Sequence, residues 1–430
     1  MSDPATGKDI AFPRHPLPSQ FCNLERLLDA MEARGLDGIV ATTPLNVFYL
    51  SGFNGIGHKS DEPRPYAVII SRHAPEHPIL VIADYYLSTF LIQPTWIEDI
   101  RPFRAVMMGL DLTPKPEDID RFMPAAGTNP DWLARARSNY TFDMTSNVQG
   151  ALKALGLTRG TVAFDDMAFG FRLGLEDAEV RDGYDAMMAA RAIKTGAELA
   201  LIERATALNQ RAIERTVASW DKGASWRDIN QAYHQATTEL GGFIHDPGAM
   251  VWGHPRGADP IVTLQTGLED FEVEPGTHIL FDCHGTLDLY CWDGGKSWVV
   301  GGEPNTQAKS HATVVKEVAQ TLIDAMRPGV RISELQTLGR EVYRKCGAPE
   351  PDGALIFFHG LGLSHMDLEM TTADGHPNGD WALAENMVVP LHLLYPGGEC
   401  ERIWLEEVVV VTASGGRPLF SWGLDPFIAA

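Results

Sequence analysis

The chain has 430 residues, of which 44% are hydrophobic and 21% are charged, and its formal net charge is −22 at pH 7. This length exceeds what one ordinary hydrophobic core holds, so the sequence predicts a globular protein of two domains. The negative charge disfavours nucleic acid and anionic membranes as partners, and no apolar run is long enough to span a bilayer. Five cysteines without a compact framework favour a reducing compartment, which predicts a cytoplasmic location.

The first part of the sequence is typical of an α/β domain over residues 21–190. Residues 1–20 are polar and rich in proline, which predicts an N-terminal arm. Apolar residues at helical spacing predict a helix over 23–36 that ends near Gly35. Alternating strands and helices farther along complete the domain, with strands at 37–41, 66–70, 78–83 and 160–164 and a helix near 183–191.

A long segment over residues 103–150 interrupts this alternation. It is rich in proline, methionine and polar residues, and it is longer than most connections between elements. We therefore expect irregular structure there, which is either flexible without a function or acts as a flap or a dimer contact, and we favour a functional role.

The remaining residues, 191–430, predict a second domain in which long helices alternate with strands that carry acids. Apolar stripes at helical spacing predict helices over 196–220, 226–240, 310–326 and 333–343. This pattern favours a curved sheet backed by helices.

Two carboxylates lie at the centre of the second domain. The apolar run 279–281 leads into Asp282, and Asp293 precedes the apolar run 298–300, which predicts two adjacent buried strands with an acid on each. His359 follows another apolar run, and Glu406 lies in the β-favouring stretch 403–412. Buried acids are costly unless they are paired, hydrogen-bonded or bound to metal, so this set predicts a cation site.

The order and spacing of these residues resemble the pita-bread metalloenzyme family. That family includes methionine aminopeptidase, aminopeptidase P, prolidase, creatinase and a dimethylsulfoniopropionate lyase. The likeness rests on Asp282 and Asp293, eleven residues apart, on His359 followed by Gly-Leu-Gly, and on Glu406 six residues before Thr412.

The resemblance extends upstream of these residues. Arg191, Lys194 and Glu198 form an R-x-x-K-x-x-x-E pattern similar to the start of the family's catalytic domain, and residues 44–53 resemble the N-terminal domain of its creatinase and prolidase branch. The likeness implies an α/β N-terminal domain plus an α+β pita-bread catalytic domain, in a homodimer. It also implies one or two divalent ions of manganese, iron, zinc or cobalt, and a small-molecule or dipeptide substrate.

Two of the proposed site positions depart from the family pattern. His392 stands where the family has its fourth ligand, a glutamate. Imidazole binds zinc, iron or manganese but cannot bridge two ions as a carboxylate does, so one metal position is altered or lost. His365 follows His359 by six residues instead of seven or eight. It stands near a histidine that stabilises the tetrahedral intermediate in the peptidases, or in place of the acidic base of the lyase branch.

Other positions differ as well. Gln265 and Leu264 occupy the places of a substrate-facing histidine of the peptidases, and Lys296 occupies the place of an arginine. His284, two residues after Asp282, is an additional candidate ligand if the strand continues, and the alternative is a hydrogen-bonded core or turn histidine.

Cysteines flank the two acids. Cys283 and Cys291 are interpreted as buried free thiols instead of zinc ligands, because they form no C-x-x-C pattern.

Substrate contacts are expected from loops that resemble those lining the family's pocket. The candidates are His58 and Arg64, which the resemblance places in the partner subunit's site, and His254; a solvated surface side chain is the alternative for each. Trp292 is a candidate aromatic wall for a compact cation, and the alternative is a core tryptophan.

These residues lead to three functional hypotheses. The first is a metal-dependent hydrolase of a C–N bond in a small peptide or amidino-acid-like substrate, similar to Xaa-Pro peptidases. There Asp282, Asp293, His359, His392 and Glu406 hold metal, and His365 and Glu406 act in catalysis. The second is a metal-dependent lyase resembling dimethylsulfoniopropionate lyase. The third is a metal-free creatinase-like enzyme or a non-catalytic binding protein.

Overall fold

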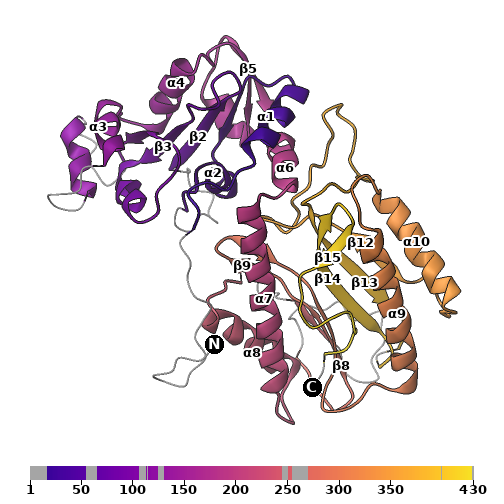
Figure 1. The fold of residues 1–430 in the computed structure, drawn as a ribbon. Helices are drawn as coiled ribbons and strands as arrows, with labels where there is room; N and C mark the ends of the chain where they lie inside the picture. The colour runs from indigo at the N-terminus through magenta and orange to yellow at the C-terminus, as the bar shows by residue number, and fades with distance from the viewer. Residues whose placement is uncertain are drawn as a thin grey trace. The chain divides into compact units, whose positions relative to one another are not determined.

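The computed structural model describes residues 17–54, 65–105, 113, 115–123, 130–244, 250–253, 270–398 and 400–428 (Figure 1). These residues divide into two compact units. The N-terminal unit holds the described residues up to Arg191 together with Glu369–Asn378, and the C-terminal unit holds Ala192–Leu368 and the residues from Gly379 onward. Within the described part of the chain, no helix is long and apolar enough to cross a membrane.

The N-terminal unit is built on a six-stranded mixed sheet. Its strand order is β4 (Asp99–Phe103), β3 (Ile79–Ala83), β2 (Tyr66–Ser71), β1 (Gly38–Ala41), β5 (Gly160–Phe164) and β6 (Ala178–Asp182). Strand β1 pairs in parallel with β5 and antiparallel with β2. All residues of β1, β2 and β3 are buried. Such continuous apolar runs mark strands covered on both faces, which is the α/β arrangement that the sequence predicts.

Helices and 3-10 helices connect these strands. They are α1 (Leu24–Ala33), α2 (Pro44–Ser51), η1 (Asp84–Leu91), η2 (Pro116–Phe122), α3 (Asp131–Ser138), α4 (Met144–Ala154), α5 (Met167–Arg172) and α6 (Tyr184–Ala192). Helix α1 starts where the Asn23 side chain accepts a hydrogen bond from the Arg26 amide, and it ends just before Gly35, which has a φ of +64°. Glycine adopts this left-handed conformation without steric cost, so the helix stops where the sequence predicts.

The prediction of irregular structure over 103–150 is wrong for its second half. Helices α3 and α4 lie there, and α4 begins where the Asp143 side chain accepts a hydrogen bond from the Ser146 amide at 2.8 Å. Their apolar stripes are narrow, because only a few residues such as Val148, Ala151 and Leu152 are buried. Because most of their residues are polar and exposed, short capped helices of this kind are hard to predict from apolar periodicity. A role as flap or dimer contact stays a prediction.

The C-terminal unit contains a seven-stranded sheet. Its order is β12 (Leu355–Phe358), β13 (Val388–Tyr395), β14 (Ile403–Thr412), β11 (Gly295–Val299), β8 (His278–Asp282) and β7 (Met250–Trp252), with β15 (Gly415–Pro418) beside β14. A separate hairpin consists of β9 (Gly285–Leu287) and β10 (Tyr290–Trp292). The predicted pairing of the two strands next to the acids is confirmed, because β8 and β11 are antiparallel neighbours.

Two helix pairs pack against this sheet. Helices α7 (Gly196–Ala218) and α8 (Trp226–Glu239) form a core with β8 and β11, and helices α9 (Thr306–Ala325) and α10 (Ile332–Lys345) form another with β12, β13 and β14. Side chains alternate between the two faces of a strand. Leu391, Leu393 and Leu405 belong to the helix-side core, so His392 and Glu406 project from the opposite face.

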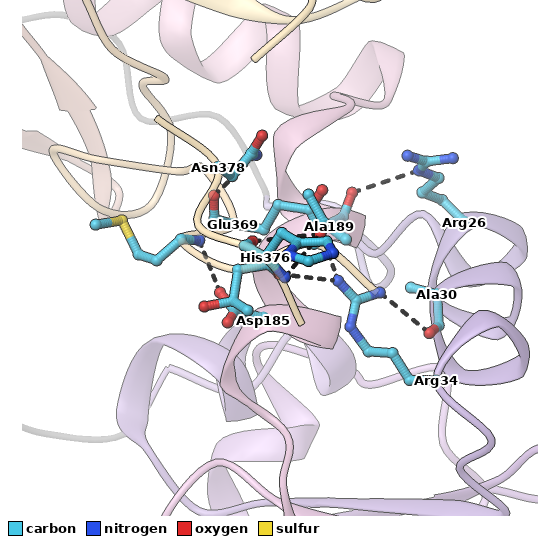
Figure 2. Close-up of polar contacts among 11 residues, drawn as sticks. Arg26, Ala30, Arg34, Asp185, Ala189, Glu369, His376 and Asn378 are labelled. Carbon is cyan, nitrogen blue, oxygen red and sulfur yellow. Dashed lines mark hydrogen bonds and ion pairs between the residues drawn. The ribbon is translucent and has the colours of Figure 1, made fainter. Parts of the chain in front are cut away.

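The segment Glu369–Asn378 is a lobe that clusters with the N-terminal unit, although the flanking residues belong to the other unit. Arg34, directly after α1, has a side-chain nitrogen 2.5 Å from a carboxylate oxygen of Glu369. The Asp185 side chain of α6 accepts a hydrogen bond from the Met370 amide at 2.8 Å (Figure 2). Within the lobe, the Asn378 amide donates to the Met370 carbonyl. Sequence periodicity contains no signal for this arrangement.

Candidate metal centre

The side chains predicted as metal ligands come from neighbouring strands of the C-terminal sheet. Asp282 ends β8, and Asp293 lies in the connection from β10 to β11. His359 directly follows β12, while His392 of β13 and Glu406 of β14 are cross-strand partners. Residues far apart in the sequence therefore meet at one place on the sheet.

The β9–β10 hairpin determines where Asp293 lies relative to Asp282. Its two-residue turn has Asp288 at φ 51° and Leu289 at φ 70°, the geometry of a type I′ turn, whose twist matches that of the strands. Gly295 follows the hairpin in close contact with β8, because a Cβ there would lie 2.3 Å from the Phe281 carbonyl oxygen. The chain thus leaves Asp282, turns tightly and returns with Asp293 beside the same strand.

Four buried side chains converge on one point. Each of Asp293, His359, His392 and Glu406 offers a ligand atom, and these atoms all lie within 4.8 Å of one another. His392 Nε2 lies 2.9 Å from Glu406 Oε1, and His359 Nε2 lies 3.3 Å from Asp293 Oδ2. Two carboxylates and two imidazoles in this arrangement are a suitable donor set for a divalent transition metal.

The hydrogen bonding of these atoms supports a cation between them. Asp293 Oδ2, His359 Nε2 and both carboxylate oxygens of Glu406 are buried and have no aligned hydrogen bond to another described residue. Buried polar atoms without a hydrogen-bond partner are rare in proteins. A cation bound between these atoms would supply the missing partner to all of them. The residues present therefore fit a divalent metal ion.

Burial and mutual repulsion shift the pKa values of the acids apart. Burial, together with the charge of Asp293, raises the pKa of Asp282 to about 7. Burial and both aspartates raise the pKa of Glu406 well above its usual value. Burial also opposes the ionisation of Asp293, but the close approach of the His359 and His365 imidazoles outweighs it and holds the pKa of Asp293 well below the usual range. Without a cation, the site therefore retains at least one proton near neutral pH.

His392, which stands where the resemblance expects a glutamate, is part of this cluster. Its side chain is 3% exposed, and burial lowers the pKa of its imidazole to about 3. The ring is therefore neutral near pH 7, the form in which histidine binds metal.

His365 lies at the edge of the cluster. Its Nε2 is 2.9 Å from Asp293 Oδ2, and half of its side chain is exposed. Its ring centre lies 4.6 Å from that of His359 and 5.5 Å from that of His284. The strand does not continue to His284, because β8 ends at Asp282, yet the hairpin keeps His284 close to His365.

Aromatic side chains surround His392. The Phe357 ring stacks on the imidazole at 3.8 Å between centres, and the Trp404 ring approaches it edge-on at 5.7 Å. Trp252 lies against Trp404 at 5.4 Å. The sequence analysis does not assign Phe357 to the site, and Trp404 is only one of several tryptophans near the proposed ligands in sequence. The signal was available, since Phe357 precedes His359 by two residues and Trp404 precedes Glu406 by two, and residues two apart share a face of a strand.

Trp292, predicted as a substrate contact, lies in the core instead. Its side chain is fully buried, and its Nε1 donates a hydrogen bond to the Tyr233 hydroxyl at 3.1 Å. The alternative of a core tryptophan accounts for this placement. The other predicted substrate contacts, His58, Arg64 and His254, lie outside the described residues. Cys283 and Cys291 are buried thiols outside any disulfide, as expected.

Comparison with known sequences places this centre in a family. Residues 200–413 match the profile of metallopeptidase family M24, and residues 23–173 match the creatinase/prolidase N-terminal domain. The chain belongs to the pita-bread M24 family. An uncharacterised peptidase from Staphylococcus aureus is 21% identical to this M24 chain over 401 residues, which are 91% of the chain and 97% of the relative.

Solved structures show the same fold. The X-Pro aminopeptidase from Thermotoga maritima superposes with a TM-score of 0.63 at 19% identity, over 95% of this M24 chain and 99% of that one. The prolidase from Pyrococcus furiosus superposes with a TM-score of 0.62 at 16% identity, over 91% and 98%. The expected α/β N-terminal domain plus pita-bread catalytic domain is thereby confirmed.

Proposed function

We propose that this M24 protein is a metal-dependent hydrolase of a C–N bond in a small peptide or amidino-acid-like substrate, with Xaa-Pro dipeptides as the first candidates. The observation that carries the proposal is the buried convergence of Asp293, His359, His392 and Glu406, beside the half-exposed His365. Two proteins of similar structure, an X-Pro aminopeptidase and a prolidase, support the peptide class.

The donor set suits one or two ions of manganese, iron, zinc or cobalt. Asp293, His359, His392 and Glu406 would hold metal, with Asp282 beside them in contact with Glu406. A divalent ion bound there would supply Lewis-acid activation of water and of the scissile carbonyl group.

We assign proton transfer to two side chains. Glu406 belongs to the metal cluster, so its carboxylate would lie within reach of a proton from the attacking water. His365 contacts Asp293 on one side and is half exposed on the other, so its imidazole can pass a proton to the leaving amine. The aromatic rings of Phe357 and Trp404 limit the access of bulk water to His392.

The test is an assay of Xaa-Pro dipeptides with detection of the released amino acid. We expect release that stops on chelation and returns when Mn²⁺ or Co²⁺ is added. An alkene acid released from a sulfonium propionate, without consumption of water, would instead identify a lyase. Turnover by protein shown to contain no metal would establish the creatinase-like hypothesis and overturn ours.

Replacing His392 tests the ligand that differs from the family pattern. We expect His392→Ala to weaken metal affinity by at least roughly tenfold, because the site loses a neutral donor in direct reach of Glu406. The measurement is metal content per chain by elemental mass spectrometry. His311→Ala is the matched control, since His311 is also a buried histidine of this unit but contacts the Glu401 carbonyl instead of the cluster. Equal metal content in both variants would remove His392 from the site.

The assembly and location of the protein stay predictions from the sequence. A homodimer and a cytoplasmic enzyme acting on a small molecule or dipeptide are consistent with the proposed function. Sedimentation of the purified chain would test the dimer directly.

A further inference from the structure

Lys194 is a buried lysine whose role the proposed mechanism does not include. Its side chain is 0% exposed, and its Nζ lies 3.6 Å from Asp367 Oδ2, which is also 0% exposed. A fully buried ion pair is expensive to desolvate and is weak evidence of stabilisation by itself. The relevant question is which neighbouring segments the Lys194–Asp367 pair holds in place.

Asp367 closes the loop that follows β12. Its carboxylate accepts hydrogen bonds from the amides of Leu363 at 3.0 Å and Ser364 at 3.2 Å. The loop is packed tightly around this carboxylate, because a Cβ on Gly362 would lie 2.0 Å from Asp367 Oδ2. The loop begins at His359 and carries His365, so Asp367 determines the path of the chain between these two histidines.

A second carboxylate near Lys194, that of Glu198, contacts the strand that leads to Asp293. Glu198 forms a capping box with Thr195 at the start of α7, and it accepts a hydrogen bond from the Tyr290 hydroxyl at 3.0 Å. Tyr290 begins β10, whose end leads directly to Asp293. The amide of Cys291, also in β10, donates to the Gly362 carbonyl at 2.7 Å, which joins this strand to the histidine loop.

Lys194 is the cation common to both carboxylates. Burial raises the pKa of Glu198 to about 7, the positive charge of Lys194 opposes that rise, and Asp367 adds to it. One ammonium group thus offsets two acids that belong to different segments of the site. Removing it would leave both carboxylates in an apolar setting without this counter-charge.

We propose that Lys194 is a positioning residue: through Asp367 and Glu198 it fixes the histidine loop 359–367 and strand β10, and so sets His365 and His359 against Asp293. Lys194 acts only through these neighbours and is not proposed to touch substrate or metal. This role also explains the Lys and Glu of the R-x-x-K-x-x-x-E pattern by their contacts in this chain.

The first test is amide hydrogen exchange of the full-length, metal-loaded protein, followed by mass spectrometry of peptides covering 359–367. We expect Lys194→Met and the isosteric Asp367→Asn each to speed exchange of the Leu363 and Ser364 amides about tenfold or more, because each change weakens the hydrogen bonds that protect them. The double variant should exchange no faster than the single ones, since the two residues act as one unit. Wild-type exchange in this loop, or an additive effect in the double variant, would overturn the proposal.

A matched control separates positioning from a general loss of stability. Lys296 is another buried lysine of this unit, and it donates to backbone carbonyls of the C-terminal segment at Trp422 and Gly423. We expect Lys296→Met to destabilise the fold but to leave loop 359–367 protected. Faster exchange of this loop in Lys296→Met, to the same degree as in Lys194→Met, would show that any buried charge has this effect and would overturn the assignment.

Turnover supplies a second readout, which rests on the proposed hydrolase function. We expect Lys194→Met to lower kcat about tenfold or more with little change in KM, because a misplaced His365 affects proton transfer more than ground-state binding. If wild-type protein hydrolyses no dipeptide, the proposed function fails, but the exchange experiment still decides the role of Lys194. A fall in activity caused by metal loss is recognised by measuring the metal content of the same samples.

Discussion

Asp293→Asn is expected to lose most of the bound metal and to slow dipeptide hydrolysis roughly a thousandfold, equivalent to about 4 kcal/mol of barrier. Asp293 is fully buried and contacts both His359 and His365. It is also the acid of this cluster whose pKa is held well below the usual range, so it provides the negative charge that attracts a cation. Asparagine keeps the shape of the side chain and removes that charge. Metal content and kcat, measured on the same preparation, check the expectation.

Asp288→Asn is the matched control for that experiment. Asp288 lies in the turn of the hairpin that leads to Asp293, is partly exposed, and pairs with Arg204 at 3.5 Å. Asparagine tolerates the left-handed conformation that this position adopts, so the turn should survive the change. Metal content and turnover should stay close to those of the wild type. If Asp293→Asn behaved like this control, the cluster would not be the metal centre.

The stability of the chelated protein is expected to fall by several kcal/mol between about pH 5 and about pH 8, and bound metal should abolish most of that loss. The pKa of Asp282 is raised to about 7, and that of Glu406 is raised as well. As pH increases past the ordinary carboxyl pKa, these groups ionise in the unfolded chain but keep their protons in the folded one. The folded state then binds more protons, so stability decreases until the pH passes the folded pKa values.

Other groups do not reverse this sign. Glu198 and Glu407, whose pKa values are raised to about 7 and about 8, contribute in the same direction. His392, whose pKa is lowered to about 3, opposes them only up to the ordinary histidine pKa, and one such group does not outweigh the four raised carboxyl groups. Asp293 has a lowered pKa, so its contribution to stability is lost only at pH values below the ordinary carboxyl pKa, outside the tested window. Urea unfolding at the two pH values, with chelator and with added Mn²⁺, measures the effect. Glu406→Gln should flatten the dependence in chelator, whereas an unchanged slope in that variant would contradict this origin.

The sequence predicts the architecture well because its cues are local. Apolar stripes specify α7 to α10, and β-favouring runs specify the strands that carry Asp282, His392 and Glu406. The resemblance supplied the fold, which the family profiles and the superposed structures confirm. The convergence of His392 with Glu406 also agrees with expectation, since it requires only that the two strands pair in register.

The features that the sequence does not predict depend on contacts between segments that are far apart in the chain. Trp292 belongs to the core because the Tyr233 hydroxyl and helix α8 lie against it, and no local pattern distinguishes it from Trp404 beside the site. His284 is near His365 because a tight hairpin, not a continued strand, follows Asp282. The association of Lys194 with Asp367 joins residues more than a hundred and seventy positions apart, so spacing alone cannot predict it.

The lobe Glu369–Asn378 has a consequence for how the protein can be divided. The chain passes between the two units at residues 191–192, again at 368–369, and back at 378–379. A single cut after residue 191 would therefore separate Glu369 from Arg34 and the Met370 amide from Asp185. The N-terminal fragment would lack part of its unit, and the C-terminal fragment would carry the lobe without its partners. A truncation meant to isolate the N-terminal unit would therefore lose the lobe, and a shuffling event that exchanged that unit would have to replace or redesign the lobe as well.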